Sequence, residues 1–181
     1  LLSGSNSTVR YSTVLNNTVI GVNTTGSASV VTNNTILYNP TGFTSGGQNT
    51  TAYLNNASYN TGPGLEATAN NITFHSNTVL GNNKGIRLNS TSGRAYNNSI
   101  QSSTLAGIEF AGQNNTAWNN TLSANNYSIV FTSALNNVVE NTTMNTPTTA
   151  HVYASSSSSN NSVVNTNFTK TSITIADSNS N

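Results

Sequence analysis

Apolar and polar residues alternate along this chain in short runs, and the runs recur about every 22 residues. Two apolar residues stand two positions apart at Ile86 and Leu88, and again at Ile108 and Phe110. A spacing of two is typical of a β-strand with one buried face. The runs are rich in Val, Ile, Thr and aromatic residues, and Gly, Pro and Asn-Asn bound them. The pattern therefore predicts short strands joined by turns.

Three columns of residues follow this period. An aliphatic column comprises Phe43, Leu65, Ile86, Ile108, Ile129, Ala150 and Ile173. An aromatic column comprises Tyr53, Phe74, Tyr96 and Trp118. An asparagine column comprises Asn17, Asn34, Asn77, Asn98 and Asn120, with a degenerate copy at Asn56. A period near 22 is too short for two packed helices and fits one turn of a parallel β-helix with two or three strands.

Each column carries a structural expectation. In-register strands place equivalent side chains above one another, so we expect the aliphatic and aromatic columns to form two buried stacks. We expect the asparagines to bond from coil to coil, since side-chain amides satisfy polar groups that a turn buries. Glycine precedes the aliphatic residue in four coils, which indicates either a positive φ or a close backbone approach. These glycines are Gly42, Gly64, Gly85 and Gly107.

The segment Asn77–Leu88, Asn-Thr-Val-Leu-Gly-Asn-Asn-Lys-Gly-Ile-Arg-Leu, and its counterparts resemble the right-handed parallel β-helix repeat family, in particular the short-coil repeats of NosD-like and surface proteins. The resemblance implies an all-β fold: a single-stranded, right-handed parallel β-helix of about eight coils. We expect the β-helix over residues 9–175, an N-terminal segment over 1–8 and a polar tail over 176–181. The family includes enzymes, adhesins and structural proteins, so the resemblance implies no single function.

Composition narrows the classes of function. Asn, Thr and Ser number 35, 29 and 26 among 181 residues, and only 5% of residues are charged, against about 25% in ordinary domains. Five scattered cations make no basic patch, which argues against nucleic-acid binding. The chain has no Cys and no apolar run long enough to span a membrane. It begins at Leu1 without a visible signal peptide, which suggests a processed chain or a fragment.

Sequons for N-glycosylation are frequent. Asn-x-Ser/Thr occurs 15 times, a modest excess over what this composition produces by chance. Several of these asparagines directly precede a member of the asparagine column, so they are expected to face outward when their neighbour faces inward. The predicted glycosylation sites are Asn16, Asn23, Asn33, Asn89, Asn97 and Asn119. The alternative is that they form solvated turns without a glycan.

The few charged residues allow two interpretations. Glu66, Arg87 and Glu109 each follow the aliphatic column by one residue, and Val130 and His151 continue the same row. The three charged residues are therefore expected to point outward and stack with alternating sign. The first interpretation is an exposed ion ladder. The second is a glycosidase site whose two carboxylates lie two coils, about 9.6 Å, apart. His75 and His151 fall on different columns, so we predict no metal site and no cofactor.

These observations favour a non-catalytic extracellular structural protein, a glycosylated β-helix subunit of a surface filament or surface layer. We expect copies to assemble head to tail through Leu1 and Leu2 at one end and Ile173 and Ile175 at the other, because a β-helix leaves unpaired strands at both ends. The alternative is a carbohydrate-active or carbohydrate-binding module, resembling a polysaccharide lyase, a hydrolase or an adhesin. Clustered carboxylates in a cleft would favour that alternative.

Overall fold

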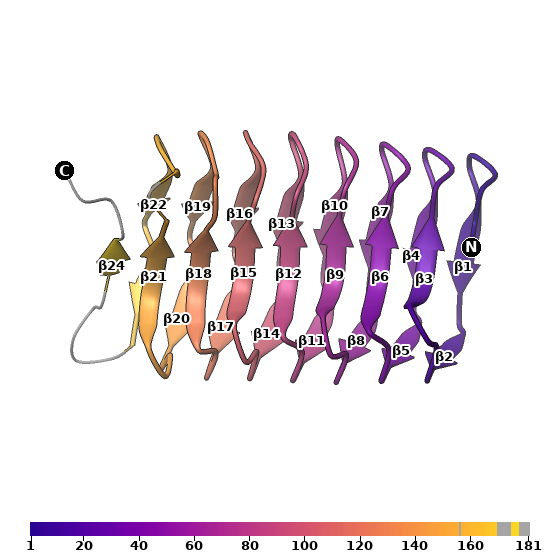
Figure 1. The fold of residues 1–181 in the computed structure, drawn as a ribbon, viewed down its shortest axis with the longest axis horizontal. Coiled ribbons are helices and arrows are strands. Elements are labelled where there is room, and N and C mark those ends of the chain that lie inside the picture. The colour runs from indigo at the N-terminus through magenta and orange to yellow at the C-terminus, as the bar shows by residue number, and fades with distance from the viewer. Residues whose placement is uncertain (156, 170–174, 178–181) are drawn as a thin grey trace.

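The chain coils into a rod of stacked, parallel β-strands (Figure 1). The structure is a computed structural model, and it describes residues 1–155, 157–169 and 175–177. Within those residues the secondary structure consists of β-strands, with no helix. Each coil contributes one strand to each of three parallel sheets. Each sheet has eight strands, so the rod makes about seven full turns. The expected all-β parallel β-helix is confirmed.

The three sheets are named here by the order in which a coil enters them. Sheet 1 contains β1 (Thr8–Arg10), β4 (Val30–Thr32), β7 (Thr51–Tyr53), β10 (Thr73–His75), β13 (Arg94–Tyr96), β16 (Thr116–Trp118), β19 (Val138–Glu140) and β22 (Ser162–Val164). Sheet 2 contains β2 (Thr13–Leu15), β5 (Thr35–Leu37), β8 (Asn56–Ser58), β11 (Thr78–Leu80), β14 (Ser99–Gln101), β17 (Thr121–Ser123), β20 (Thr143–Asn145) and β23 (Asn167–Phe168). Sheet 3 contains β3 (Ile20–Thr24), β6 (Thr41–Ser45), β9 (Pro63–Ala67), β12 (Lys84–Leu88), β15 (Ala106–Phe110), β18 (Tyr127–Phe131), β21 (Ala150–Ala154) and β24 (Ile175–Asp177).

The aliphatic column is confirmed over its first five members and wrong at Ala150. Phe43, Leu65, Ile86, Ile108 and Ile129 pair in register on sheet 3, and none of them is exposed. The next partner is Val152 rather than Ala150, and Val152 pairs with Ile175. The connection over residues 132–137 and the turn over 146–149 are each one residue longer than their counterparts over 111–115 and 124–126. Together they shift the register by two residues. Ile173 lies outside the described residues.

The aromatic column is wrong for three of its four members. Phe74 is fully buried, and it aligns with Ala52, not Tyr53. Tyr53, Tyr96 and Trp118 share an outward row whose fourth member is His75. Side chains alternate faces along a strand, so a register error of one residue exchanges inside for outside.

Alternation of residue size fills the narrow interior. The inward positions of sheet 1 hold Val31, Ala52, Phe74, Ala95, Ala117 and Val139, all fully buried. In two of the three coils where sheet 1 supplies alanine, sheet 3 supplies a bulky ring: Phe110 shares a coil with Ala95, and Phe131 shares one with Ala117. The core therefore packs without a large residue on every wall.

Asparagine ladders run along all three corners of the coil, where the sequence predicted one. The corner between sheets 1 and 2 holds Asn34, Asn55, Asn77, Asn98 and Asn120. The corner between sheets 2 and 3 holds Asn17, Asn39, Asn60 and Asn82. The corner between sheets 3 and 1 holds Asn115, Asn137 and Asn161. Asn17 thus belongs to a second ladder, and Asn55 rather than Asn56 is the ladder member in its coil.

The glycine column reflects close packing. A Cβ on Gly85 would lie 2.5 Å from the carbonyl oxygen of Gly107 in the next coil, and a Cβ on Gly64 would lie 2.8 Å from Asn82 Nδ2. Among the described glycines only Gly81, outside this column, has a positive φ. Of the two explanations that the sequence allowed, close backbone approach is the correct one.

Candidate functional site

The outward face of sheet 3 carries a cluster of four charged side chains, Glu66, Lys84, Arg87 and Glu109. Its first row contains Thr41, Pro63, Lys84, Ala106, Tyr127 and Ala150, and its second row contains Thr44, Glu66, Arg87, Glu109, Val130 and Tyr153. Gly85 and Ile86 are both buried although they are adjacent. This break in alternation turns Lys84 outward beside Arg87. Sequence reasoning missed Lys84 because it assumed strict alternation through the glycine.

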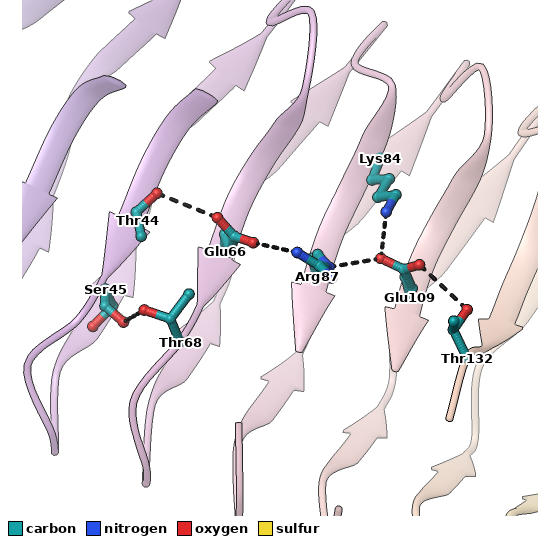
Figure 2. A network of polar contacts seen from close by, with 8 residues as sticks. All are labelled: Thr44, Ser45, Glu66, Thr68, Lys84, Arg87, Glu109 and Thr132. Carbon is teal, nitrogen blue, oxygen red and sulfur yellow. Dashed lines mark hydrogen bonds and ion pairs between the residues drawn. The ribbon is translucent and has the colours of Figure 1, made fainter. Parts of the chain in front are cut away.

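The charged side chains form one continuous network (Figure 2). Arg87 lies between two carboxylates: its Nη1 donates to Glu66 Oε1 at 2.8 Å, and its Nε lies 2.9 Å from Glu109 Oε2. The second contact is an ion pair without the alignment of a hydrogen bond. Lys84 Nζ lies 2.7 Å from the same Oε2.

Threonines close the network at its two ends. Thr44 Oγ1 donates to Glu66 Oε2 at 3.5 Å, and Thr132 Oγ1 donates to Glu109 Oε1 at 3.3 Å. The two carboxylates and two cations sum to zero charge. The predicted ion ladder is therefore present, but it is not an exposed one, because the Glu109 side chain is only 6% exposed.

This arrangement does not suit the two carboxylates for acid–base catalysis. The two carboxyl groups of a glycosidase flank the scissile bond and leave the space between them to the substrate. Here Arg87 stands between Glu66 and Glu109 and contacts both, and Lys84 also contacts Glu109. A side chain therefore fills the space that a glycosidic bond would need.

The outward row of sheet 3 that holds Glu66, Arg87 and Glu109 is called the charged row here. A pocket of about 280 Å³ opens beside Glu109, where this row ends. It is lined by Leu105, Glu109, Tyr127, Val130, Thr132 and Tyr153. Val130 pairs with Glu109 on one side and with Tyr153 on the other. The rings of Tyr127 and Tyr153 lie 5.3 Å apart at 42°. The sequence had placed His151 after Val130 in this row, but His151 is fully buried and packs edge-on against Phe168.

The outward row of sheet 1 is a stack of four rings. Neighbouring ring centroids from Tyr53 through His75 and Tyr96 to Trp118 lie 5.0, 4.9 and 4.4 Å apart, with planes within 14° of parallel. The ring faces contact one another and only their edges point outward. Burial between the tyrosines lowers the pKa of His75 below its usual value of 6.5.

The predicted glycosylation sites lie at the surface. Asn16, Asn33, Asn89, Asn97 and Asn119 are exposed, and Asn23 is half-buried on the outward face of sheet 3. Ten of the fifteen sequon asparagines are exposed corner residues with positive φ: Asn6, Asn16, Asn33, Asn49, Asn71, Asn97, Asn114, Asn119, Asn141 and Asn160. The fold thus favours the Asn-Asn-Thr pattern by itself, since the corner favours Asn, the ladder favours Asn and a strand favours Thr. The sequon excess therefore does not by itself indicate glycosylation.

The residues predicted to join copies occupy different settings. Leu1 is 83% exposed. Leu2 pairs within its own chain, since its N–H donates to Asn23 O at 2.7 Å and its carbonyl accepts from Thr25 N–H at 2.8 Å. Ile175 belongs to β24, and Ile173 is outside the described residues. The main chain of Leu2 therefore covers the open edge of β3, the first strand of sheet 3.

Neither a metal-binding cluster nor a membrane-spanning helix is found among the described residues. Across residues 1–155, 157–169 and 175–177, no group of three or more His, Cys, Asp or Glu side chains is placed to hold a metal ion. The same residues contain no helix long and apolar enough to cross a membrane.

Comparison with known families agrees with the three-sheet coil. Residues 63–181 match the family model described as the right handed beta helix region. The chain belongs to the right-handed β-helix family. Neither a curated protein sequence nor a solved structure gives a significant match to the chain. The family membership establishes the fold and its hand, and it leaves the function of this β-helix to be inferred from its own surface.

Proposed function

We propose that this β-helix is a non-catalytic structural rod of an extracellular or cell-surface assembly, a filament or a layer, that carries N-linked glycans. The observation that carries the proposal is that the polar side chains of the rod bond to one another. Asparagine side chains bond to one another along the interior corners, and the two carboxylates of the sheet 3 face are paired with cations. Both arrangements rigidify the rod.

The competing function, cleavage of a polysaccharide, needs two carboxyl groups with space between them for the glycosidic bond. Arg87 occupies that space between Glu66 and Glu109. Glu140 lies on the outward row of sheet 1 beside Trp118, away from those two carboxylates. The proposal of a structural rod is therefore favoured on the chemistry of the described face.

Exposed apolar residues at one end of the rod support the proposed contact between copies. Tyr11, Leu15 and Val19 belong to the first coil, with exposures of 76%, 47% and 66%, and Leu1 just before it is 83% exposed. Large apolar groups gathered on one surface are typical of contact sites. Because Leu2 pairs within its own chain, we place the contact on the first coil rather than on residues 1–8 alone. A head-to-tail contact of this kind propagates into a filament.

Sedimentation and electron microscopy test this assembly. We expect the purified chain to form end-to-end polymers, and we expect Leu15→Lys combined with Val19→Lys to leave monomers with unchanged circular dichroism. Leu135→Lys is the matched control, because Leu135 is 36% exposed but lies far from the first coil. Polymers that persist in the double variant, or a wild-type chain that stays monomeric at high concentration, would refute the proposed assembly.

A further inference from the structure

The pocket at the end of the charged row has the chemistry of a binding site rather than of a gap in packing. Two tyrosine rings and Val130 give it apolar surface, and Glu109 and Thr132 place polar groups on the same lining. Its volume of about 280 Å³ is slightly below the roughly 300–1,000 Å³ of sites for drug-sized molecules. The pocket therefore suits a ligand about the size of one sugar ring.

The charge of the pocket decides between ligand classes. Glu109 supplies its negative charge, and Lys84 and Arg87 already balance it at 2.7 and 2.9 Å. A cationic ligand would meet two cations beside the carboxylate. An anionic ligand would meet a buried carboxylate, while Arg87 is also held by Glu66. A neutral ligand avoids both costs.

The hydrogen-bonding capacity of Glu109 points the same way. Lys84 and Arg87 both lie against Oε2, whereas Oε1 accepts only from Thr132 at 3.3 Å among the described residues. A carboxylate oxygen has two lone pairs, so Oε1 can accept one more hydrogen bond. A hydroxyl donor supplies that bond without adding charge, and Thr132 Oγ can accept a bond from a second hydroxyl.

We propose that the pocket formed by Glu109, Tyr127, Thr132 and Tyr153 binds one ring of a neutral pyranose sugar. An apolar face of the ring lies against tyrosine, and a ring hydroxyl donates to Glu109 Oε1. The proposal goes beyond the structural role, because a rod with such a site holds a neutral polysaccharide to the assembly. It does not depend on whether copies polymerise.

Titration calorimetry and ligand-observed NMR test the pocket with defined probes. The neutral probes are methyl glycosides of glucose, mannose, galactose and N-acetylglucosamine. The charged probes are methyl galacturonide and tetramethylammonium. We expect at least one neutral glycoside to bind with a Kd on the order of 1 mM, because a single ring buries little area. Neither charged probe should bind as tightly.

Variants assign the binding to this pocket. Tyr153→Ala should weaken the glycoside by about tenfold, the equivalent of one lost ring contact, and Thr132→Val should weaken it through the lost hydroxyl. Tyr59→Ala is the control, because Tyr59 is 47% exposed and does not line the pocket. All three variants should keep the urea midpoint of a folded rod.

Three outcomes would overturn the proposal. The first is that no neutral glycoside in the panel binds. The second is tighter binding of the uronide or of tetramethylammonium, which would contradict the charge argument. The third is binding that survives both Tyr153→Ala and Thr132→Val in folded protein, which would place the ligand elsewhere on the rod.

Discussion

At the residue scale, the corners of the coil depend on pairs of residues with two different tasks. The first residue adopts a positive φ near 55°, as at Asn33, Asn97 and Asn119. The second points inward and continues a ladder, as Asn34, Asn98 and Asn120 do. Asparagine suits both tasks, because it tolerates the left-handed region and its amide both donates and accepts. This is the physical reason for the many Asn-Asn pairs.

Removing one ladder amide should be costly. Asn98 Oδ1 accepts from Asn77, and its Nδ2 donates to Asn120 and to the carbonyl of Phe74. Asn98→Ala leaves several buried groups without partners at about 1–3 kcal/mol each. We expect a loss of about 3 kcal/mol or more in the free energy of unfolding, measured by urea denaturation. Gln101→Ala, at an exposed strand position, should change it by less than about 0.5 kcal/mol.

At the element scale, each sheet stacks equivalent strand positions from successive coils. The outward rows of different sheets differ in chemistry. Sheet 3 carries the charged row, whereas sheet 1 carries the four stacked rings. Because strands pair in parallel and in register, a side chain finds its counterpart above and below without any turn bringing it there. Interactions therefore extend along the rod and rarely around it.

The ring stack predicts a pH dependence of stability. Burial lowers the pKa of His75 in the folded rod below 6.5, so as the pH falls the unfolded chain takes up this proton first. The unfolded state then binds more protons, and stability falls as the pH drops from about 7 through 6.5 until the folded pKa is passed. In His75→Gln the urea midpoint should change less with pH over this range. If the midpoint falls as steeply in this variant as in the wild type, another group causes the pH dependence.

The corrected registers of the two columns predict unequal mutational costs. Ile108 is fully buried on sheet 3, whereas Tyr96 lies on the outward row of sheet 1. Ile108→Ala should cost about 2–5 kcal/mol through the cavity it leaves. Tyr96→Ala should cost about 1 kcal/mol, the worth of cross-strand ring contacts. Equal costs in denaturant titrations would contradict the outward placement of the aromatic row.

At the scale of the whole molecule, the rod exposes long β-surfaces with little charge. Only 5% of residues are charged, and four of them neutralise one another on sheet 3. Low net charge and long exposed strands favour association between chains. Bulky glycans at the corners would keep such rods apart along their sides while leaving the ends free.

The proposed coat is tested by mass spectrometry of glycopeptides from native material. We expect attachment at several of Asn16, Asn33, Asn97 and Asn119, which are exposed and precede Asn-Thr, Asn-Ser or an equivalent pair. Thr35→Ala removes the sequon of Asn33 and should abolish its glycan alone, since Thr35 only begins β5. Unmodified asparagine at every site would reject the coat and leave the sequon pattern explained by the corners.

The sequence by itself determined the β-helix, the coil length and most of the sheet 3 interior. Its period of about 22 residues and its spacing of two can be read from short segments. Because the pattern recurs in each coil, every coil supports the assignment made in the others. The alternating row of Glu66, Arg87 and Glu109 followed from the same counting. These features need only the period and the alternation of strand side chains.

Only the tertiary structure decided the features that depend on a shift of one or two residues. Two extra residues between β18 and β21, one in each of two connections, moved Val152 and Tyr153 into the rows assigned to Ala150 and His151. Counting from Phe74 instead of His75 placed three outward rings inside. The inward glycine at Gly85 turned Lys84 toward Glu109, and the pocket arose where Tyr127 and Tyr153 met from different coils. The length of a turn can vary at little energetic cost, whereas side-chain direction along a strand reverses at each residue. The row that a residue joins is therefore fixed only when the coils stack.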